Sequence, residues 1–306
     1  SKDIKHFLIR YYKIFPPILD DLDVLHIQWT KTIIDYPDFF ELIDCPIVLS
    51  MRGTQINVSP IVSSKISNLY KKYFLKIDAF HAVSELILNE TIKYGINKER
   101  ISVIKPAVED SLLSCENNTI SIQNSEQINI ISVGRCHWVK GYSFALDTML
   151  LLKNKGIDFH YTIVANGKDT ENLTYQILDL ELTKWVTFIN GLEHEKVIKK
   201  IVESHLLFVP SIIEGIPNVV LEAMALNVPV ISTKCGGINE VIKNLYNGII
   251  IPQRDPVVMC EKIVEFINLD YRVKQNLIKN ARETIKQGYK LSDQIQQFNK
   301  LYSEVV

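Results

Sequence analysis

The chain has 306 residues, of which 47% are hydrophobic and 23% are charged, and its formal net charge is −1. This length predicts about two domains, and the composition is ordinary for a globular protein with a full core. The near-neutral charge gives no basic field that would attract nucleic acid. The five cysteines show no C-x-x-C spacing, which favours reduced thiols over a disulfide framework or a zinc site.

The first part of the chain alternates strand-like and helical segments. Lys2 to Ile14 predicts a helix, and Ser84 is a predicted N-cap for a helix that stops before Gly95. The polar segment Cys115 to Gln127 predicts an interdomain linker. Residues 1–120 therefore predict an N-terminal domain that repeats the strand–helix alternation less completely. Its predicted strands are Val24 to Gln28, Ile47 to Met51, Ala79 to Val83 and Ile101 to Ile104.

Residues 127–285 show the same alternation in complete form. Near-continuous Val, Ile and Leu strands separated by helices predict a parallel sheet covered on both faces, as in a doubly wound nucleotide-binding domain. The predicted strands are Ile128 to Gly134, Tyr161 to Ala165, Val186 to Ile189, Leu206 to Pro210, Val228 to Thr233 and Gly248 to Pro252. The predicted helices between them are Tyr142 to Lys155, Thr170 to Leu182, His194 to Glu203, Asn218 to Leu226 and Ile238 to Lys243.

The C-terminal part predicts three helices, Pro256 to Leu269, Tyr271 to Gln287 and Ser292 to Val305. No strand follows the last of them, so we expect residues 286–306 to pack back on the N-terminal domain. No apolar run reaches the length of a membrane span and no signal peptide is visible. We therefore expect a cytoplasmic protein.

Two carboxylates, Glu214 and Glu222, bracket a loop and the start of a predicted helix. Pro217 suits the first helical turn, because its missing N–H is not needed there, and Glu222 then falls more than one turn into the helix. The free N–H groups of a helix start bind anions, and two acids beside them suit sugar and ribose hydroxyls. The pair therefore indicates an enzyme that binds a nucleotide sugar.

A basic loop, Gly134 to Gly141, follows the first strand of the second predicted domain. Open parallel sheets bind ligands at the carboxyl ends of their strands. Arg135 and Lys140 at that edge could clamp a diphosphate, since the arginine offers two parallel donors. Taken alone, the loop is equally well explained as a basic surface connection between a strand and a helix.

In combination, these segments resemble glycosyltransferase family 4, a family of retaining enzymes with the GT-B fold. The resemblance covers roughly residues 79–306 and depends on the order of the motifs along successive strands of one domain. It implies two Rossmann-like doubly wound α/β domains that face a cleft. The N-terminal one, over residues 1–120, would be the acceptor side and is incomplete. The motifs are Gly134-Arg135 with Lys140-Gly141, Glu214 with Glu222, Val230 to Gly237 with Glu240, Asn247-Gly248, and Ala82 to Ser84, Gly95 and Ile101 to Pro106 in the first domain.

The resemblance also implies residue roles. Arg135 and Lys140 would neutralise the donor diphosphate, Glu222 would bind the ribose diol, and Glu214 would contact hydroxyls of the donor sugar. Glu214, Arg135 and Lys140 are the implied catalytic residues, with no metal and no cofactor beside a UDP- or GDP-sugar substrate. The other implied donor-binding residues are Gly134, Gly215, Ile216, Pro217, Asn218, Asn190, Gly191, Leu192 and Arg52.

The implied function is metal-independent, retaining transfer of a hexose to a glycan or glycolipid acceptor in polysaccharide or lipopolysaccharide synthesis. The charge that develops on the leaving diphosphate needs a metal ion or fixed cations, and the basic loop and helix start supply the second. Retention is generally ascribed to front-face attack, in which the leaving phosphate helps to deprotonate the acceptor. The alternatives are a truncated or inactive module that binds the donor without transfer, and a dehydrogenase-type protein, against which no G-x-G-x-x-G follows any strand.

The first domain departs from the family in two ways. Arg52 stands where many members carry a histidine near the donor; it can bind phosphate or an acceptor anion but cannot act as a base, because it stays protonated. Members also begin with a strand and a Gly-rich loop, which nothing before residue 23 matches. Either the N-terminus has been removed, leaving a chain that binds donor without turnover, or the protein is natively short. We expect His81 to pack in its strand and His137 to be a surface residue.

Two further segments each have two explanations. Asp21-Leu-Asp23 matches the D-x-D metal motif of other glycosyltransferases, but acids at a strand entrance are usually solvated. The basic segment Ser63 to Lys76 could rest on an anionic membrane at its inner face. We favour an ordinary helix whose Leu69 and Tyr73 face the core. The expected partners are the donor and a glycan or lipid-linked sugar acceptor. A membrane is a further partner if Ser63 to Lys76 rests on one, and no nucleic acid is expected.

Overall fold

The computed structural model describes residue 12, residues 21–114 and residues 127–306. These residues form two compact units: unit 1 contains the described residues up to Lys105 together with Gln294–Val306, and unit 2 contains the rest, between Pro106 and Asp293. The division thus falls at residue 105, against a predicted boundary at 120. The helix expected over Lys2 to Ile14 and the linker expected over Cys115 to Gln127 lie outside the described residues, apart from positions 12 and 127.

Unit 1 contains a four-stranded parallel sheet in the order β1-β2-β3-β4. Every residue of β2 and β3 is buried, as expected for apolar strands covered on both faces. Helix α7 (Glu85–Ile92) begins at Ser84, whose hydroxyl accepts a hydrogen bond from the Ile87 N–H, so the predicted N-cap is confirmed. The strands are β1 (Leu25–Ile27), β2 (Ile47–Met51), β3 (Ala79–Ala82) and β4 (Ile101–Val103).

The basic segment predicted as a helix forms α6 (Ser64–Tyr73). Its Tyr70 and Tyr73 are buried, while Lys71 and Lys72 are exposed, so its aromatic face packs on the core. The other short helices are α3 (Lys31–Asp35), α4 (Thr54–Asn57) and α5 (Ser59–Val62), with 3-10 turns η1 (Pro37–Glu41), η2 (Phe74–Lys76) and η3 (Lys98–Arg100). The last helix, α15 (Leu291–Ser303), buries Leu301 against Val48, Ala79 and Ile104 of unit 1.

Unit 2 contains a six-stranded parallel sheet in the order β10-β9-β8-β5-β6-β7. Its strands are β5 (Ile128–Cys136), β6 (Phe159–Gly167), β7 (Val186–Ile189), β8 (Leu206–Val209), β9 (Val230–Thr233) and β10 (Ile249–Ile251). The helices are α8 (Asp110–Ser114), α9 (Tyr142–Asn154), α10 (Thr170–Asp179), α11 (His194–Val202), α12 (Asn218–Ala225), α13 (Pro256–Asn268) and α14 (Tyr271–Gly288).

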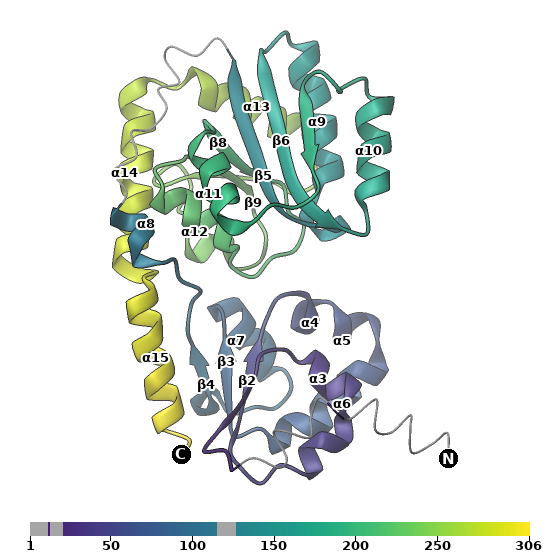
Figure 1. Cartoon of the computed structure of the whole chain (residues 1–306), viewed down its shortest axis with the longest axis vertical. Coiled ribbons are helices and arrows are strands. Elements are labelled where there is room, and N and C mark those ends of the chain that lie inside the picture. Colours follow the sequence, from purple (N-terminus) through teal and green to yellow (C-terminus); the bar gives the residue numbers. More distant parts are fainter. Residues whose placement is uncertain (1–11, 13–20, 115–126) are drawn as a thin grey trace. The chain divides into compact units, whose positions relative to one another are not determined.

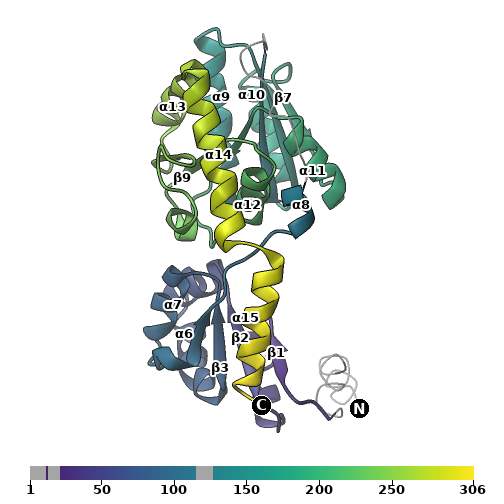
Figure 2. The same ribbon diagram turned by 90° about the vertical axis from the view of Figure 1, so that its left-hand side faces the viewer.

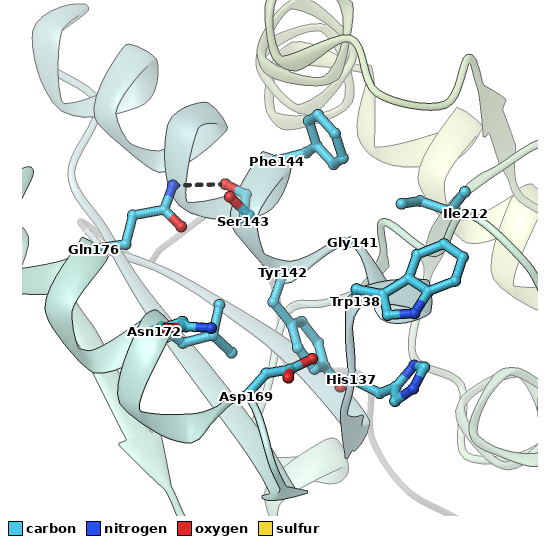
Figure 3. A pocket seen from close by; sticks show the side chains of 11 residues that line it. His137, Trp138, Gly141, Tyr142, Ser143, Phe144, Asp169, Asn172, Gln176 and Ile212 are labelled. Carbon is cyan, nitrogen blue, oxygen red and sulfur yellow. Dashed lines mark hydrogen bonds between the residues drawn. The ribbon is translucent and has the colours of Figure 1, made fainter.

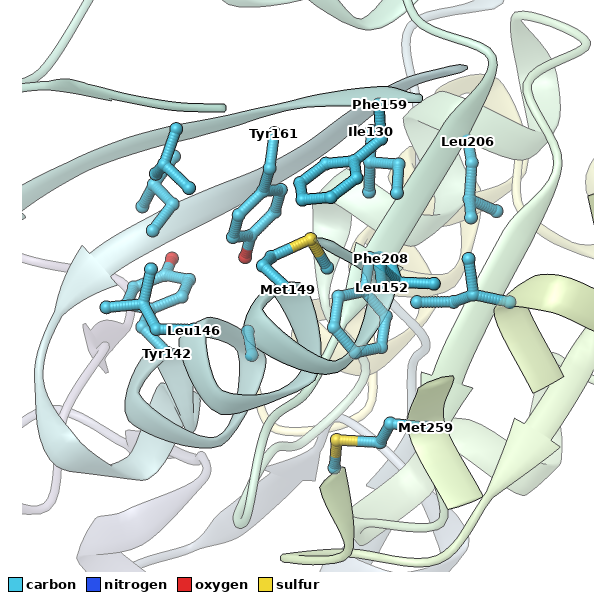
Figure 4. Close-up of a cluster of buried hydrophobic side chains, with 14 of the residues drawn as sticks. Ile130, Tyr142, Leu146, Met149, Leu152, Phe159, Tyr161, Leu206, Phe208 and Met259 are labelled. Atoms are coloured by element: carbon cyan, nitrogen blue, oxygen red, sulfur yellow. The ribbon is translucent and has the colours of Figure 1, made fainter. Parts of the chain in front are cut away.

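Helices cover both faces of this sheet (Figures 1 and 2). On one face α9, α10 and α13 build a core in which Tyr142 and Met149 of α9 lie among Tyr161 and Phe208 of the strands (Figure 4). On the other face α11, α12 and α14 build a second core. The helices that follow the neighbouring strands β5 and β8 therefore lie on opposite faces. Such a switch point, at the carboxyl ends of the strands, is where open parallel sheets bind ligands.

Two predicted details differ from the structure. The helix expected over Ile238 to Lys243 is instead a 3-10 turn, η6 (Gly236–Glu240). Gly236 has a φ of 53°, and a Cβ there would lie 1.8 Å from the carbonyl oxygen of Glu214. This close docking onto the Glu214 loop bends the chain too tightly for a regular helix. Pro217 lies at the N-cap of α12 rather than in its first turn.

Across the ranges that the structure describes, no helix combines the length and the apolar character that a membrane span requires.

Candidate functional site at the β5 and β8 strand ends

The basic loop and the Glu214 loop meet at the switch point between β5 and β8. After β5 the chain forms the 3-10 turn η5 (Trp138–Lys140), and the Ile212 N–H donates to the carbonyl oxygen of Val139 at 2.7 Å. Gly141 has a φ of 67°, and a Cβ there would lie 2.1 Å from the carbonyl oxygen of Pro210. Only glycine permits so close an approach, and the contact brings Lys140 beside Glu214.

Lys140 and Glu214 form an ion pair with 2.5 Å between Nζ and Oε1, and their side chains are only 15% and 12% exposed. The Ser211 hydroxyl donates to the same carboxylate oxygen at 2.8 Å. Gly134 makes room for Lys140, because a Cβ at residue 134 would lie 3.0 Å from Cε of Lys140. Charge-assisted contacts shielded from water are stronger than surface ion pairs. The residues assigned to the phosphates and to the sugar are thus bonded to each other in this structure.

A buried tyrosine hydroxyl lies beside this pair. Tyr142 is 3% exposed, and its Oη has no hydrogen-bond partner among the described residues. A Cβ on Gly134 would meet this Oη at 2.9 Å, which places the hydroxyl against the same glycine as Lys140. Burial, and then the neighbouring Tyr161, Glu214 and Cys136, raise the pKa of Tyr142 well above its usual range. The group is therefore a neutral donor without an acceptor, which costs about 1–3 kcal/mol.

The backbone after Glu214 is held by the η6 turn. The Gly237 N–H donates to the carbonyl oxygen of Gly215 at 2.8 Å, and no side chain caps the start of α12. Pro217 has no N–H, so it cannot donate to an anion bound by the backbone from Gly215 to Asn218. Donors to an anion can come only from the other three residues of that stretch.

Glu222 lies more than one turn into α12, where its Oε1 is 3.0 Å from Nε2 of His194. The carboxylate side chain is 15% exposed and the histidine side chain 61%. His194 is the first residue of α11 and follows the predicted loop Asn190 to Leu192. In that loop Gly191 has a φ of 76° and packs against Asn166 at the end of β6. Glu222 therefore lies beside the β7–α11 connection, as a group that binds ribose at this edge would.

The remaining predicted site residues lie apart from these contacts. Arg135 is exposed at the end of β5. Arg52 belongs to unit 1, where its Nη2 donates to Gln28 Oε1 at 2.7 Å and its guanidinium lies 5.6 Å from the centre of the Trp29 ring. Burial lowers the pKa of Arg52. Asp21 and Asp23 are exposed, and the described residues contain no group of three His, Cys, Asp or Glu side chains placed to hold a metal ion.

Three contributors were not singled out as site residues by the sequence: Ser211 against Glu214, His194 against Glu222, and Gly236 beneath the Glu214 backbone. Ser211 could have been found, because it is the last residue before the acidic loop. His194 gives no such signal, since a histidine at the start of a helix is common on protein surfaces.

Comparison with known proteins places this site in a family. A family model described as "Glycosyl transferases group 1" matches residues 116–284, more than half of the chain, and the chain belongs to this family. It is 26% identical over 226 residues to the putative colanic acid biosynthesis glycosyltransferase WcaL of Escherichia coli, covering 72% of this chain and 55% of that protein. It is 24% identical over 247 residues to the amylovoran biosynthesis glycosyltransferase AmsK of Erwinia amylovora, covering 78% and 59%. The chain thus spans little more than half the length of these relatives.

Solved structures agree on the fold. A glycosyltransferase from Rickettsia africae matches with a TM-score of 0.77 at 19% identity, over 99% of this chain and 80% of that one. Anabaena Alr3699/HepE, solved with UDP and glucose, matches with a TM-score of 0.76 at 19% identity, over 92% and 77%. The predicted α/β architecture of two Rossmann-like parallel-sheet domains, with GT-B enzymes as structural neighbours, is therefore confirmed.

Proposed function

We propose that this glycosyltransferase moves a hexose, with retention of anomeric configuration and without a metal ion, from a UDP- or GDP-sugar to a glycan or glycolipid acceptor in polysaccharide or lipopolysaccharide synthesis. The observation that carries the proposal is the meeting of Lys140, Ser211 and Glu214 at the switch point between β5 and β8. In the proposed complex Arg135 and Lys140 bind the diphosphate, Glu222 binds the ribose and Glu214 binds sugar hydroxyls. The loop Asn190 to Leu192 borders the base.

The Lys140–Glu214 ion pair suggests how the donor enters. A diphosphate that takes the ammonium of Lys140 frees one lone pair of the Glu214 carboxylate, which then accepts from a sugar hydroxyl while Ser211 keeps the carboxylate in place. Each charge therefore exchanges one partner for another, and neither is left buried alone, which would be costly. Binding of the phosphate and binding of the sugar are thus coupled through one pair.

The proposed transfer needs no protein nucleophile. The bond between C1 of the sugar and the phosphate oxygen breaks, and the acceptor oxygen bonds to C1 on the same face. The acceptor hydroxyl proton passes to the leaving phosphate, whose growing charge is stabilised by Arg135 and Lys140. Arg52, which stays protonated, is proposed to contact a donor phosphate or an acceptor anion.

A donor panel tests this function. The chain is incubated with UDP- and GDP-linked hexoses and candidate glycan acceptors in the presence of EDTA, and released nucleotide and the anomeric linkage of the product are measured. Transfer with retention in EDTA supports the proposal; activity only with added metal, or an inverted linkage, contradicts the corresponding part. Nucleotide binding without transfer to any acceptor would instead identify a donor-binding module.

A membrane surface is the proposed location of the acceptor. Ile61 and Val62, at the end of α5, are 78% and 77% exposed, and the exposed Lys65, Lys71 and Lys72 follow them on α6. An apolar tip beside a cationic helix suits the cytoplasmic face of an anionic bilayer. Sedimentation with phosphatidylglycerol vesicles should exceed that with phosphatidylcholine vesicles and should fall in Ile61→Ser/Val62→Ser. Equal sedimentation with both lipids would contradict this location.

A further inference from the structure

A cavity of about 290 Å³ lies in unit 2 beside the basic loop, and neither Lys140 nor Glu214 is among the residues that line it. It opens between the starts of α9 and α10, with Trp138 and Ile212 on one side and Gln176 of α10 on the other (Figure 3). Ligand sites begin at about 300 Å³, so this space suits one small ring rather than a nucleotide. The same 3-10 turn carries Trp138, which lines the cavity, and Lys140, which does not.

The lining excludes an anion as the ligand. Among the described residues that line the cavity there is no lysine and no arginine, whereas Asp169 contributes a carboxylate. A phosphate, a sugar acid or a second nucleotide would meet that negative charge without a cation to offset it. The ligand must therefore be neutral or positively charged.

Two acceptor side chains line the cavity, Gln176 and Asp169, and neither has a partner for an acceptor oxygen among the hydrogen bonds of the described residues. Gln176 donates its amide to the carbonyl oxygen of Ser143 at 3.1 Å and to Asp147 Oδ1 at 2.9 Å, which leaves its Oε1 as the free end, turned toward the cavity in Figure 3. Asp169 lies at the N-cap of α10, where an aspartate usually accepts from the helix start, yet its side chain makes no such bond. Both acceptors are therefore available to a ligand.

Hydrogen-bond donors and an aromatic face complete the lining, which also contains Ser143 and Asn172. His137 Nδ1 accepts from the Val139 N–H, so the neutral ring carries its proton on Nε2 and can donate. The Trp138 side chain is 52% exposed on the cavity wall. Its ring offers a flat apolar surface of low conformational entropy, on which the C–H face of a pyranose ring can lie. Donors and acceptors side by side match hydroxyl groups, each of which can both donate and accept.

We propose that this cavity binds one neutral hexose unit of a glycan, at a site separate from the donor site. The sugar ring lies against Trp138, its vicinal hydroxyls donate to Asp169 and Gln176, and one hydroxyl accepts from His137. The proposal does not depend on the transfer reaction, because it concerns only equilibrium binding of a sugar to unit 2.

Saturation-transfer NMR on the full chain tests the site. The probes are the methyl pyranosides of glucose, galactose, mannose, fucose and N-acetylglucosamine, each measured with saturating UDP so that the donor site is filled. At least one should bind saturably, and Trp138→Ala and, independently, Asp169→Ala should each weaken it about tenfold, the loss of one good contact. Tyr175→Ala is the matched control, because Tyr175 is an exposed aromatic residue of α10 that does not line the cavity; its affinity should stay within about twofold.

Four outcomes would overturn the proposal. The first is that no glycoside saturates. The second is that UDP displaces the glycoside, which would make the cavity part of the donor site. The third is that methyl glucuronide or tetramethylammonium ion binds more tightly than the neutral glycosides, which would identify an anion or a cation as the ligand. The fourth is unchanged binding in both the Trp138 and the Asp169 variants.

Discussion

Two groups of polar side chains find their hydrogen-bond partners in opposite ways. One lies at the carboxyl edge of the unit 2 sheet and the other inside the unit 1 sheet. In unit 2, Lys140 and Glu214 are opposite charges that hold each other, and the hydroxyl of Tyr142 beside them has no partner among the described residues. In unit 1 a chain of neutral groups from Tyr302 to Ile104 bonds every proton to an acceptor. The first arrangement can exchange partners with a ligand, whereas the second is closed.

The direction of the unit 1 chain follows from its end. The carbonyl oxygen of Ile104 can only accept, so His81 Nε2 donates to it at 2.8 Å and His81 Nδ1 accepts from Ser50 at 2.8 Å. His26 Nε2 then donates to Ser50 at 2.8 Å, and His26 Nδ1 accepts from Tyr302 of α15 at 2.6 Å. Both histidines must be neutral for this chain to exist. His81 therefore serves structure, as its place in a buried strand predicts.

Of the predicted changes, Glu214→Gln should have the largest effect, and it acts on the transfer rate through the Lys140–Glu214 pair of unit 2. The amide keeps the size of the side chain but loses the charge that holds Lys140 and receives sugar hydroxyls. We expect the transfer rate at saturating donor to fall about 10²–10³-fold, the range for removal of one preorganised polar contact. Steady-state kinetics with the donor found in the panel provide the measurement. A change of less than threefold would remove Glu214 from the proposed reaction.

Acidification should destabilise the hydrogen-bonded chain from Tyr302 to Ile104 in unit 1. Burial, and then the charge of Arg52, lower the pKa of His26 from 6.5 to about 4. The pKa of His81 is also lowered from 6.5 to about 4, and burial is again the main cause. Between these values the unfolded chain binds more protons than the folded chain, so stability falls as the pH drops from 6.5 toward 4. For His81, which is 2% exposed, the full loss is on the order of 3 kcal/mol.

Urea unfolding at pH 7 and at pH 5 measures part of this loss, because pH 5 still lies above the folded pKa of about 4. Burial also lowers the pKa of His205 in unit 2, which adds a loss of the same sign, so the comparison needs a variant. Whatever its stability at pH 7, His81→Gln should lose less between the two pH values than the wild type. An equal loss in both proteins would show that His81 does not titrate in this window.

The strands along the chain and the charged residues of the site could be predicted from the sequence, but the pairings of those charged residues could not. Near-continuous apolar runs mark each strand of unit 2, because both faces of its sheet are covered. The partners Lys140 and Glu214 are 74 residues apart and His194 and Glu222 are 28 apart. Such contacts depend on how loops from different strands cross at the sheet edge, through close approaches such as that of Gly141 to Pro210. Local sequence patterns do not predict such long-range approaches.

Glu222→Ala sharpens the distinction between the two carboxylates of unit 2. Glu222 bonds to an exposed histidine rather than to a buried lysine, so its loss should leave the fold intact. We expect UDP or GDP, whichever binds, to lose about tenfold in affinity, as for one hydrogen-bonded diol. Calorimetric titration measures it, with Glu203→Ala at the end of α11 as the control. Unchanged nucleotide affinity would contradict the assignment of Glu222 to the ribose.

Tyr142→Phe should have the smallest effect and the opposite sign on stability. Because the Tyr142 hydroxyl has no partner among the described residues, its removal spares a desolvation cost and should leave stability unchanged or raise it by about 1 kcal/mol. If the hydroxyl donates to Glu214 once the donor has drawn Lys140 away, the same variant should lower the transfer rate. Urea unfolding and donor kinetics on one preparation separate the two effects. A stability loss above about 1 kcal/mol would show that the hydroxyl is bonded in the resting protein, and the contrast between an open and a closed polar cluster would then fail.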